Sequence, residues 1–180
     1  VIDGSSPVHE ASVSVPLGSL QTRLIAGQIP DWSGYEYLPS TQNKLITHNL
    51  LFDFTLPTAY TGAGIDITEG KWIMKAMLAN MNSTKRTQGN NTPVIAYRAD
   101  YSRGEYQGFG FAGVFGNATH FNVDPITGGQ AADSQVSLFE VDGYFIRGDW
   151  TLQGQLSYGS QKKAAIAPDP VTGALRDAKW

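Results

Sequence analysis

The sequence predicts an all-β protein, an antiparallel up-and-down meander in the form of a transmembrane β-barrel. Several stretches of about ten residues alternate between apolar and polar side chains, which is the period of a strand with two different faces. The connections between these stretches are short and long in turn. The composition, with 20 Gly, 8 Tyr, 8 Phe and 4 Trp, favours strands over helices. We therefore expect a single β-barrel domain over residues 1–180, incomplete at both ends and part of a larger barrel.

Length, charge and composition exclude several other classes of protein. The 180 residues are enough for one domain with a core, and the absence of cysteine excludes disulfides and thiolate metal sites. A formal net charge of -3 argues against a nucleic-acid binder that depends on phosphate contacts. No apolar run approaches the roughly 20 residues of a membrane-spanning helix. The mean hydropathy of -0.22 is compatible with a soluble protein or with a barrel, because barrel strands span with about ten alternating residues.

The clearest pair of strands lies between residues 135 and 158. The first run has apolar side chains at odd positions and carboxylates at even ones, and the second has apolar side chains at even positions and amides at odd ones. These residues are Phe139, Val141, Phe145, Trp150, Leu152 and Leu156 on the apolar side, and Glu140, Asp142, Gln153 and Gln155 on the polar side. Arg147-Gly148-Asp149 supplies the turn between the runs. The tripeptide also matches an adhesion motif, but turn chemistry explains it here.

Six earlier stretches show the same alternation. They cover residues 10–15, 22–28, 60–68, 71–80, 93–103 and 107–116, which gives about eight strands with the final hairpin. Trp72, Met74, Leu78, Phe109 and Phe111 have the apolar parity. Arg98 and Asp100 have the polar parity of their strand.

The lengths of the connections assign them to the two ends of the barrel. Short turns are expected near residues 16–19, 68–70, 104–105 and 147–149, and long connections over 29–59, 82–92, 117–134 and 159–177. In a meander every second connection lies at the same end, so all short turns share one end, as in outer-membrane barrels. A strand over 44–56 would break this order. We therefore expect 29–59 to be one excursion, with its apolar segment 50–54 as a short helix or a folded strand.

One part of the chain resembles a known group of proteins. The stretches Gly34-Tyr35-Glu36-Tyr37 and 46–54 (ITHNLLFDF), followed by Pro57 and Tyr60-Thr61-Gly62, are similar to segments of uncharacterised Gram-negative outer-membrane porins of the OmpL-like β-barrel group. Asn49 and Tyr60 stand where Ser and His are common in that group. The resemblance covers roughly residues 20–68. It implies a bacterial outer-membrane β-barrel that acts as a passive diffusion channel, and it does not identify a solute.

The leading functional hypothesis is a porin through which ions and small polar solutes pass without chemistry. The polar rows are then expected to line the pore and the 29–59 excursion to narrow it. The pore-lining residues are Arg98, Asp100, Glu140, Asp142, Gln153 and Gln155, and the residues of the constriction loop are Tyr35, Glu36, Lys44 and His48. The expected partners are outer-membrane lipid and small solutes or ions, not nucleic acid. A homo-oligomer stays open, as do the solute, the ion preference and the total strand number.

Two other hypotheses use the same residues. A soluble β-sandwich or barrel could bind a ligand such as a carbohydrate through Trp32, Tyr35 and Tyr37. An enzyme could use Glu140 and Asp142, which share a strand face about 7 Å apart. A charged pore wall accounts for Arg98, Asp100, Gln153 and Gln155 as well as for the two carboxylates, which an enzyme does not. We therefore expect no enzymatic activity. No cofactor or metal site is expected either, because the three histidines lie far apart in the sequence.

Overall fold

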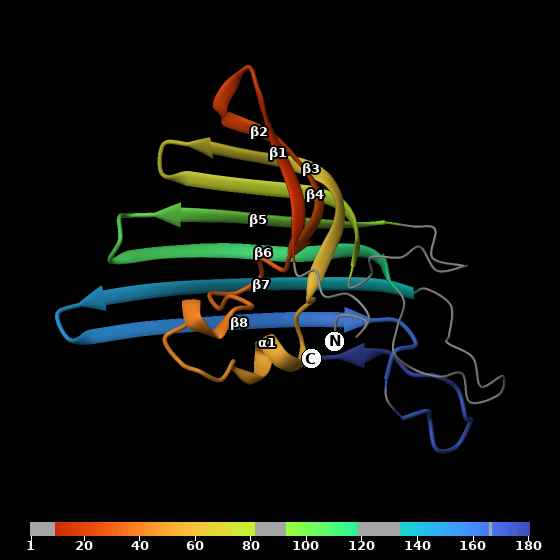
Figure 1. The fold of residues 1–180 in the computed structure, drawn as a ribbon. Helices are drawn as coiled ribbons and strands as arrows, with labels where there is room; N and C mark the ends of the chain where they lie inside the picture. The colour runs from red at the N-terminus through yellow and green to blue at the C-terminus, as the bar shows by residue number, and fades with distance from the viewer. Residues whose placement is uncertain (1–9, 82–92, 119–133, 166) are drawn as a thin grey trace.

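The computed structural model describes residues 10–81, 93–118, 134–165 and 167–180, and it confirms the predicted all-β fold, an antiparallel up-and-down meander. In these residues, nine antiparallel strands form one open sheet whose order follows the chain from β1 to β9 (Figure 1). The strands are β1 Ala11–Leu17, β2 Ser19–Pro30, β3 Ala59–Glu69, β4 Trp72–Met81, β5 Val94–Ser102, β6 Gln107–Ala118, β7 Ser134–Arg147, β8 Trp150–Gln161 and β9 Ala178–Lys179. The helical segments are the 3-10 turn η1 (Ser40–Gln42) and the helix α1 (Leu50–Phe54). No helix in the described part of the chain is long and apolar enough to span a membrane.

Four short turns join the strands in pairs, at the positions that the sequence predicts. Each turn contains a glycine with a positive φ, a backbone conformation that costs other residues energy: Gly18, Gly70, Gly104 and Gly148. The turns after β3, β5 and β7 lie together at the left of Figure 1. The connections 31–58 and 162–177 leave from the other end of the strands. The predicted long loops 82–92 and 117–134 fall almost wholly outside the described residues.

The segment 31–58 is a single excursion, and residues 44–56 do not form a strand. Its apolar part folds as the short helix α1. The Asn49 side chain caps this helix by accepting a hydrogen bond from the Phe52 N–H at 2.8 Å. The Glu36 carboxylate in turn accepts from the Asn49 N–H at 2.8 Å. In Figure 1 the excursion lies in front of β7 and β8, so it covers one face of the sheet.

The sheet therefore has two different faces, the inner face under the excursion and the outer face opposite it. The strand register aligns residues of one parity across neighbouring strands, and the outer row Met74, Ala99, Phe111, Val141 and Leu156 shows this. Large apolar side chains of β1 to β8 are exposed on the outer face, and Leu156 is 76% exposed. The residues to which the sequence analysis assigns the apolar parity of β4 and β6 to β8 lie on this face.

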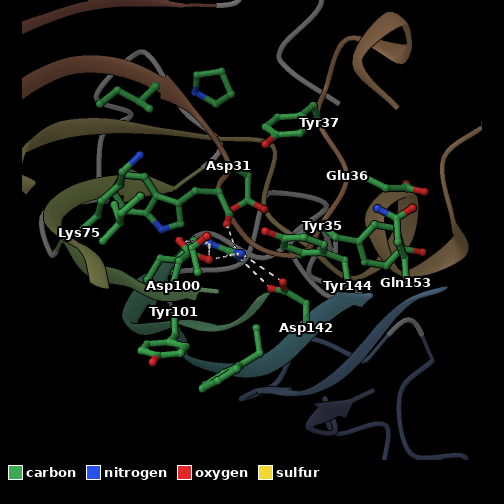
Figure 2. A pocket seen from close by; sticks show the side chains of 18 of the residues that line it. Asp31, Tyr35, Glu36, Tyr37, Lys75, Asp100, Tyr101, Asp142, Tyr144 and Gln153 are labelled. Carbon is green, nitrogen blue, oxygen red and sulfur yellow. Dashed lines mark hydrogen bonds and ion pairs between the residues drawn. The ribbon is translucent and has the colours of Figure 1, made fainter. Parts of the chain in front are cut away.

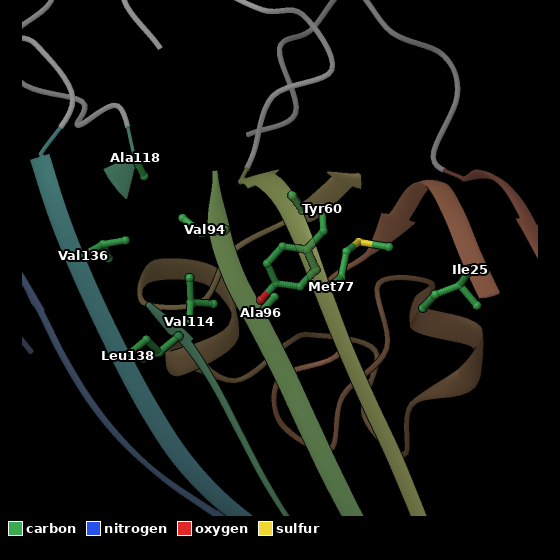
Figure 3. Packing of buried hydrophobic residues seen from close by; sticks show 10 residues of the cluster. Ile25, Tyr60, Met77, Val94, Ala96, Val114, Ala118, Val136 and Leu138 are labelled. Carbon is green, nitrogen blue, oxygen red and sulfur yellow. The ribbon is translucent and has the colours of Figure 1, made fainter. Parts of the chain in front are cut away.

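The inner face is apolar near the long connections. The buried cluster there includes Tyr60, Met77, Val94, Ala96, Val114, Val136 and Leu138 (Figure 3). Trp32 and Leu56 of the excursion pack against this cluster, and the Trp32 and Tyr60 rings lie 5.2 Å apart. The sequence analysis predicts polar residues along the whole inner face. The half near the long connections is apolar instead, because the excursion covers it. The charged side chains begin where this cluster ends.

Candidate functional site

Charged residues line up across the inner face because the strand register places them opposite one another. One row contains Arg23, Asp66, Lys75, Arg98 and, beyond Ala112, Glu140. The next row toward the short turns contains Asp100, Gly110, Asp142 and Gln155. These two rows bring five of the six predicted pore residues together, and Gln153 lies one inner row further toward the short turns, opposite Tyr144.

Arg98 is the centre of this arrangement. Its guanidinium contacts Asp100 at 2.6 Å, Asp142 at 2.9 Å and Glu140 at 3.7 Å. The Arg98 side chain is 12% exposed and that of Glu140 is 0% exposed, so solvent screens these pairs little. Planar guanidinium groups favour such multiple contacts with carboxylates. Three carboxylates share one positive charge, which leaves the cluster with an excess of acidic groups.

A glycine on β6 makes the contact between β5 and β7 possible. Gly110 lies between Asp100 and Asp142 in the register, so the Arg98 side chain has to pass over it. A Cβ atom on Gly110 would lie 2.5 Å from Asp100 Oδ1 and 2.9 Å from Arg98 Nη2. The absence of a side chain at this position therefore lets the ion pairs cross the strand.

The excursion is attached to the charged cluster through its own backbone. Arg98 Nη1 donates to the Trp32 carbonyl oxygen at 2.8 Å. The Gly34 N–H donates to Glu140 Oε1, and Gln155 Nε2 donates to Glu140 Oε2 at 2.7 Å. Gly34 has a φ of 76°, and a Cβ atom there would lie 2.7 Å from Gln155 Oε1. The close approach of excursion and sheet thus requires glycine at this position.

Asp31 follows the last residue of β2 and lies beside the same cluster. Its carboxylate accepts hydrogen bonds from the Ser33 N–H at 3.1 Å and the Ser33 hydroxyl at 3.0 Å. Burial is the largest influence and raises the pKa of Asp31 from 3.8 to about 6, against the opposite effects of Tyr60, Ser33 and Arg98. Asp31 therefore changes charge at mildly acidic pH.

A cavity of about 660 Å³ lies between the excursion and the strands, on the short-turn side of Arg98 (Figure 2). Its lining includes six of the ten predicted pore-lining and constriction residues: Tyr35, Glu36, Arg98, Asp100, Asp142 and Gln153. Glu140 and Gln155 do not line it, but both contact the cluster at its edge. The sequence-based selection thus converges on one place.

Two predicted constriction residues lie elsewhere. Lys44 is exposed and does not line the cavity. The His48 ring stacks on Phe52 with centroids 4.2 Å apart, and its Nε2 lies 3.1 Å from the Tyr37 carbonyl oxygen. Both residues belong to the part of the excursion that folds on itself around α1. The residues that contact the sheet come earlier, at 31–37.

Sequence reasoning missed three residues of the site. Asp31 and Gly34 lie in a stretch without the alternation of a strand, and the resemblance that includes Gly34 gives it no role. Gly34 acts through its backbone, which leaves no chemical signal in a sequence. Lys75 lines the cavity and lies 3.8 Å from Asp66. Lys75 could have been found from the sequence. It is a charged residue in β4, and the alternation of that strand places it on the inner face, between Met74 and Ala76 of the outer face.

The described residues provide no group of three His, Cys, Asp or Glu side chains that could hold a metal ion. The acidic side chains of the cluster are held by Arg98 and by backbone and amide donors. The arrangement can therefore attract or repel charged solutes. Both carboxylate oxygens of Glu140 already accept hydrogen bonds from Gly34 and Gln155.

Comparison with known proteins gives a family without a function. A family model described as "Protein of unknown function (DUF3138)" matches residues 3–171. No curated protein and no solved structure matches the chain. Function has to be inferred from the residues themselves.

Proposed function

Since the chain belongs to the DUF3138 family, whose description gives no function, we propose from its geometry that it forms part of a bacterial outer-membrane porin. Ions and small polar solutes would diffuse through the barrel without chemistry. The observation that carries this proposal is the apolar outer face, which no other described segment covers, opposite an inner face that holds the charged side chains.

The composition of the outer face supports contact with lipid. Apolar side chains are exposed on it from β1 to β8, including Val13, Leu24, Leu78, Ile95, Phe115, Phe139 and Leu156. Soluble monomers rarely expose contiguous apolar patches above a few hundred Å². Near the short turns, Trp72 lies 5.0 Å from the Tyr101 ring and 6.2 Å from the Phe109 ring. Aromatic side chains gathered at one end of the strands are typical of the interface girdles of such barrels.

Strand length supports the same proposal. β3 to β8 are between 9 and 14 residues long. A tilted strand needs about 9 to 11 residues to cross a bilayer, and strands in globular proteins average about 5 to 6. The sheet is open, with β1 and β9 at its edges. Lipid does not satisfy unpaired strand edges, so we propose that further strands close the barrel.

The inner face supports selection by charge and width. The carboxylates of Asp100, Glu140 and Asp142 outnumber the single guanidinium of Arg98, which favours cations in a narrow passage. The excursion narrows this passage through residues 31–37, and Trp32 fills the space next to Tyr60.

One observation favours the alternative of a soluble ligand-binding domain. Trp32, Tyr35 and Tyr37, the aromatic residues expected to contact a carbohydrate, all line the cavity. A soluble domain would, however, need a second layer over the outer face, and the described residues provide none. A binding cavity inside a porin accounts for both observations, so the porin is the better proposal.

Planar-bilayer recordings of the full-length protein test this function. We expect stepwise conductance, with a reversal potential in a KCl gradient that indicates cation preference. The double substitution Glu140→Gln and Asp142→Asn should reduce this preference. Absence of conductance from protein that is folded in lipid would refute the porin, and an unchanged reversal potential would refute the pore-lining role of the two carboxylates.

A second recording tests the constriction. Trp32→Ala removes the indole that the excursion places against the inner face, so it should raise single-channel conductance. Trp150→Ala is the matched control, because Trp150 is exposed on the outer face and does not line the cavity. Equal conductance of the two variants would contradict the narrowing of the pore by the excursion.

A further inference from the structure

The cavity beside Arg98 carries an excess of acidic side chains. Five acidic residues and two basic ones line it. The basic residues are already engaged, since Lys75 lies 3.8 Å from Asp66 and Arg98 contacts three carboxylates. Neither cation is available for an anionic solute. A positively charged solute would balance the negative charge that remains.

Aromatic rings line the same cavity. Trp32, Tyr35, Tyr37 and Tyr144 of the inner face contribute to its lining, and Figure 2 shows Tyr35 and Tyr37 near the acidic side chains. The faces of aromatic rings carry negative electrostatic potential and attract cations, including alkylammonium groups. Aromatic rings together with unbalanced carboxylates form the chemistry of an organic-cation site.

The size of the cavity favours an organic cation over a metal ion as its ligand. A volume of about 660 Å³ falls within the range of small-molecule sites. The described residues include no group of three His, Cys, Asp or Glu side chains placed so that they could hold a metal ion. A neutral solute could contact the rings, but it would leave the acidic excess unbalanced.

We propose that this cavity binds a small organic cation, with an ammonium group next to Asp31 and against the tyrosine rings. This inference names a class of solute for the proposed pore. It rests on the proposed function for the role of the site. Asp31 lines the cavity next to Trp32, and none of the ion pairs among the described residues includes it. An ammonium group at this position would stabilise the Asp31 carboxylate.

The test compares choline with 3,3-dimethyl-1-butanol, which has nearly the same shape and no charge. Both are titrated by calorimetry into the full-length protein in detergent. We expect choline to bind about ten times more tightly than the neutral alcohol, which is the scale of a partly desolvated cation–aromatic contact. Equal affinities, or no binding of choline, would overturn the inference.

Two substitutions test the position of the charge. Asp31→Asn should weaken choline binding several-fold and leave binding of the alcohol unchanged. Asp149→Asn is the same chemical change on the exposed turn between β7 and β8, and it should leave choline binding at the wild-type value. Equal effects of the two variants would overturn the assignment of Asp31. If Asp31→Asn does not fold, Tyr35→Leu serves instead, and wild-type choline affinity in that variant would overturn the site.

The pore and the binding site can fail separately. A protein that conducts KCl but does not bind choline would refute the cation site and leave the porin. A protein that binds choline in detergent but does not conduct would support the site and refute the porin. Competition by KCl that abolishes choline binding entirely would show an inorganic cation site and overturn the inference.

Discussion

Replacing Gly110 with alanine should break the connection between β5 and β7. The new Cβ atom would lie 2.5 Å from Asp100 Oδ1 and 2.9 Å from Arg98 Nη2, closer than such atoms approach in unstrained proteins. Both contacted atoms are at the ends of flexible side chains, so they would move away. The Arg98 guanidinium would then lose its 2.9 Å contact with Asp142.

The expected cost follows from overpacking and from the weakened ion pair. Forcing an extra methyl group into a packed site typically costs about 1–3 kcal/mol. Complete loss of one partner of a buried pair costs about 3–5 kcal/mol, but here the partners can adjust. We therefore expect Gly110→Ala to lower the free energy of unfolding by about 1–3 kcal/mol.

Urea unfolding in lipid vesicles, followed by tryptophan fluorescence, measures this effect. Gly154→Ala is the matched control, because Gly154 lies in β8 with no atom within 4 Å of a new Cβ. Alanine there should be neutral or slightly stabilising, since it reduces the freedom of the unfolded chain. Equal stability of the two variants would refute the argument that Gly110 is needed for the Arg98 bridge.

Two further predictions follow from the outer face and from Asp31. Phe139→Arg, near the middle of β7, should reduce folding yield in lipid vesicles at a cost of about 2–4 kcal/mol. Tyr106→Arg on an exposed turn should not, and equal yields would contradict lipid contact at Phe139. Because the folded chain keeps a proton on Asp31 up to a pKa of about 6, against 3.8 unperturbed, stability should fall as pH rises through this window. The loss is up to about 3 kcal/mol, at 1.36 kcal/mol per pKa unit. Asp31→Asn should flatten this part of the pH profile of urea unfolding, and an unchanged slope would contradict the burial of Asp31.

Most of the fold could be predicted from the sequence, because apolar and polar side chains alternate along each strand. The parity of residues such as Phe139 and Glu140 assigns them to opposite faces wherever a strand is regular. The alternation of short and long connections then decides the order of the strands. It also decides against a strand over 44–56, which the structure confirms.

The site could be predicted only in part, because parity gives the face and not the neighbours. Arg98 and Glu140 share a face by parity, but only the register through Ala112 places them in one row. Parity also assigns Val94 and Ala96 to the inner face, without saying that the excursion would bury them. The excursion contacts the sheet through the Trp32 carbonyl oxygen and the Gly34 N–H. These are backbone groups, which almost every residue has, so the sequence does not indicate where they act.

The central claim is that the outer face contacts lipid and the inner face does not. The most direct test uses two neighbouring residues, Leu156 and Ser157, which point to opposite faces of β8. Leu156→Cys and Ser157→Cys are labelled separately with a fluorophore in the full-length protein folded in vesicles, and quenching by brominated lipid is measured. We predict strong quenching of the label at position 156 and little at position 157. Equal quenching at the two positions, or quenching at 157 alone, would contradict the proposed orientation of the sheet in the membrane.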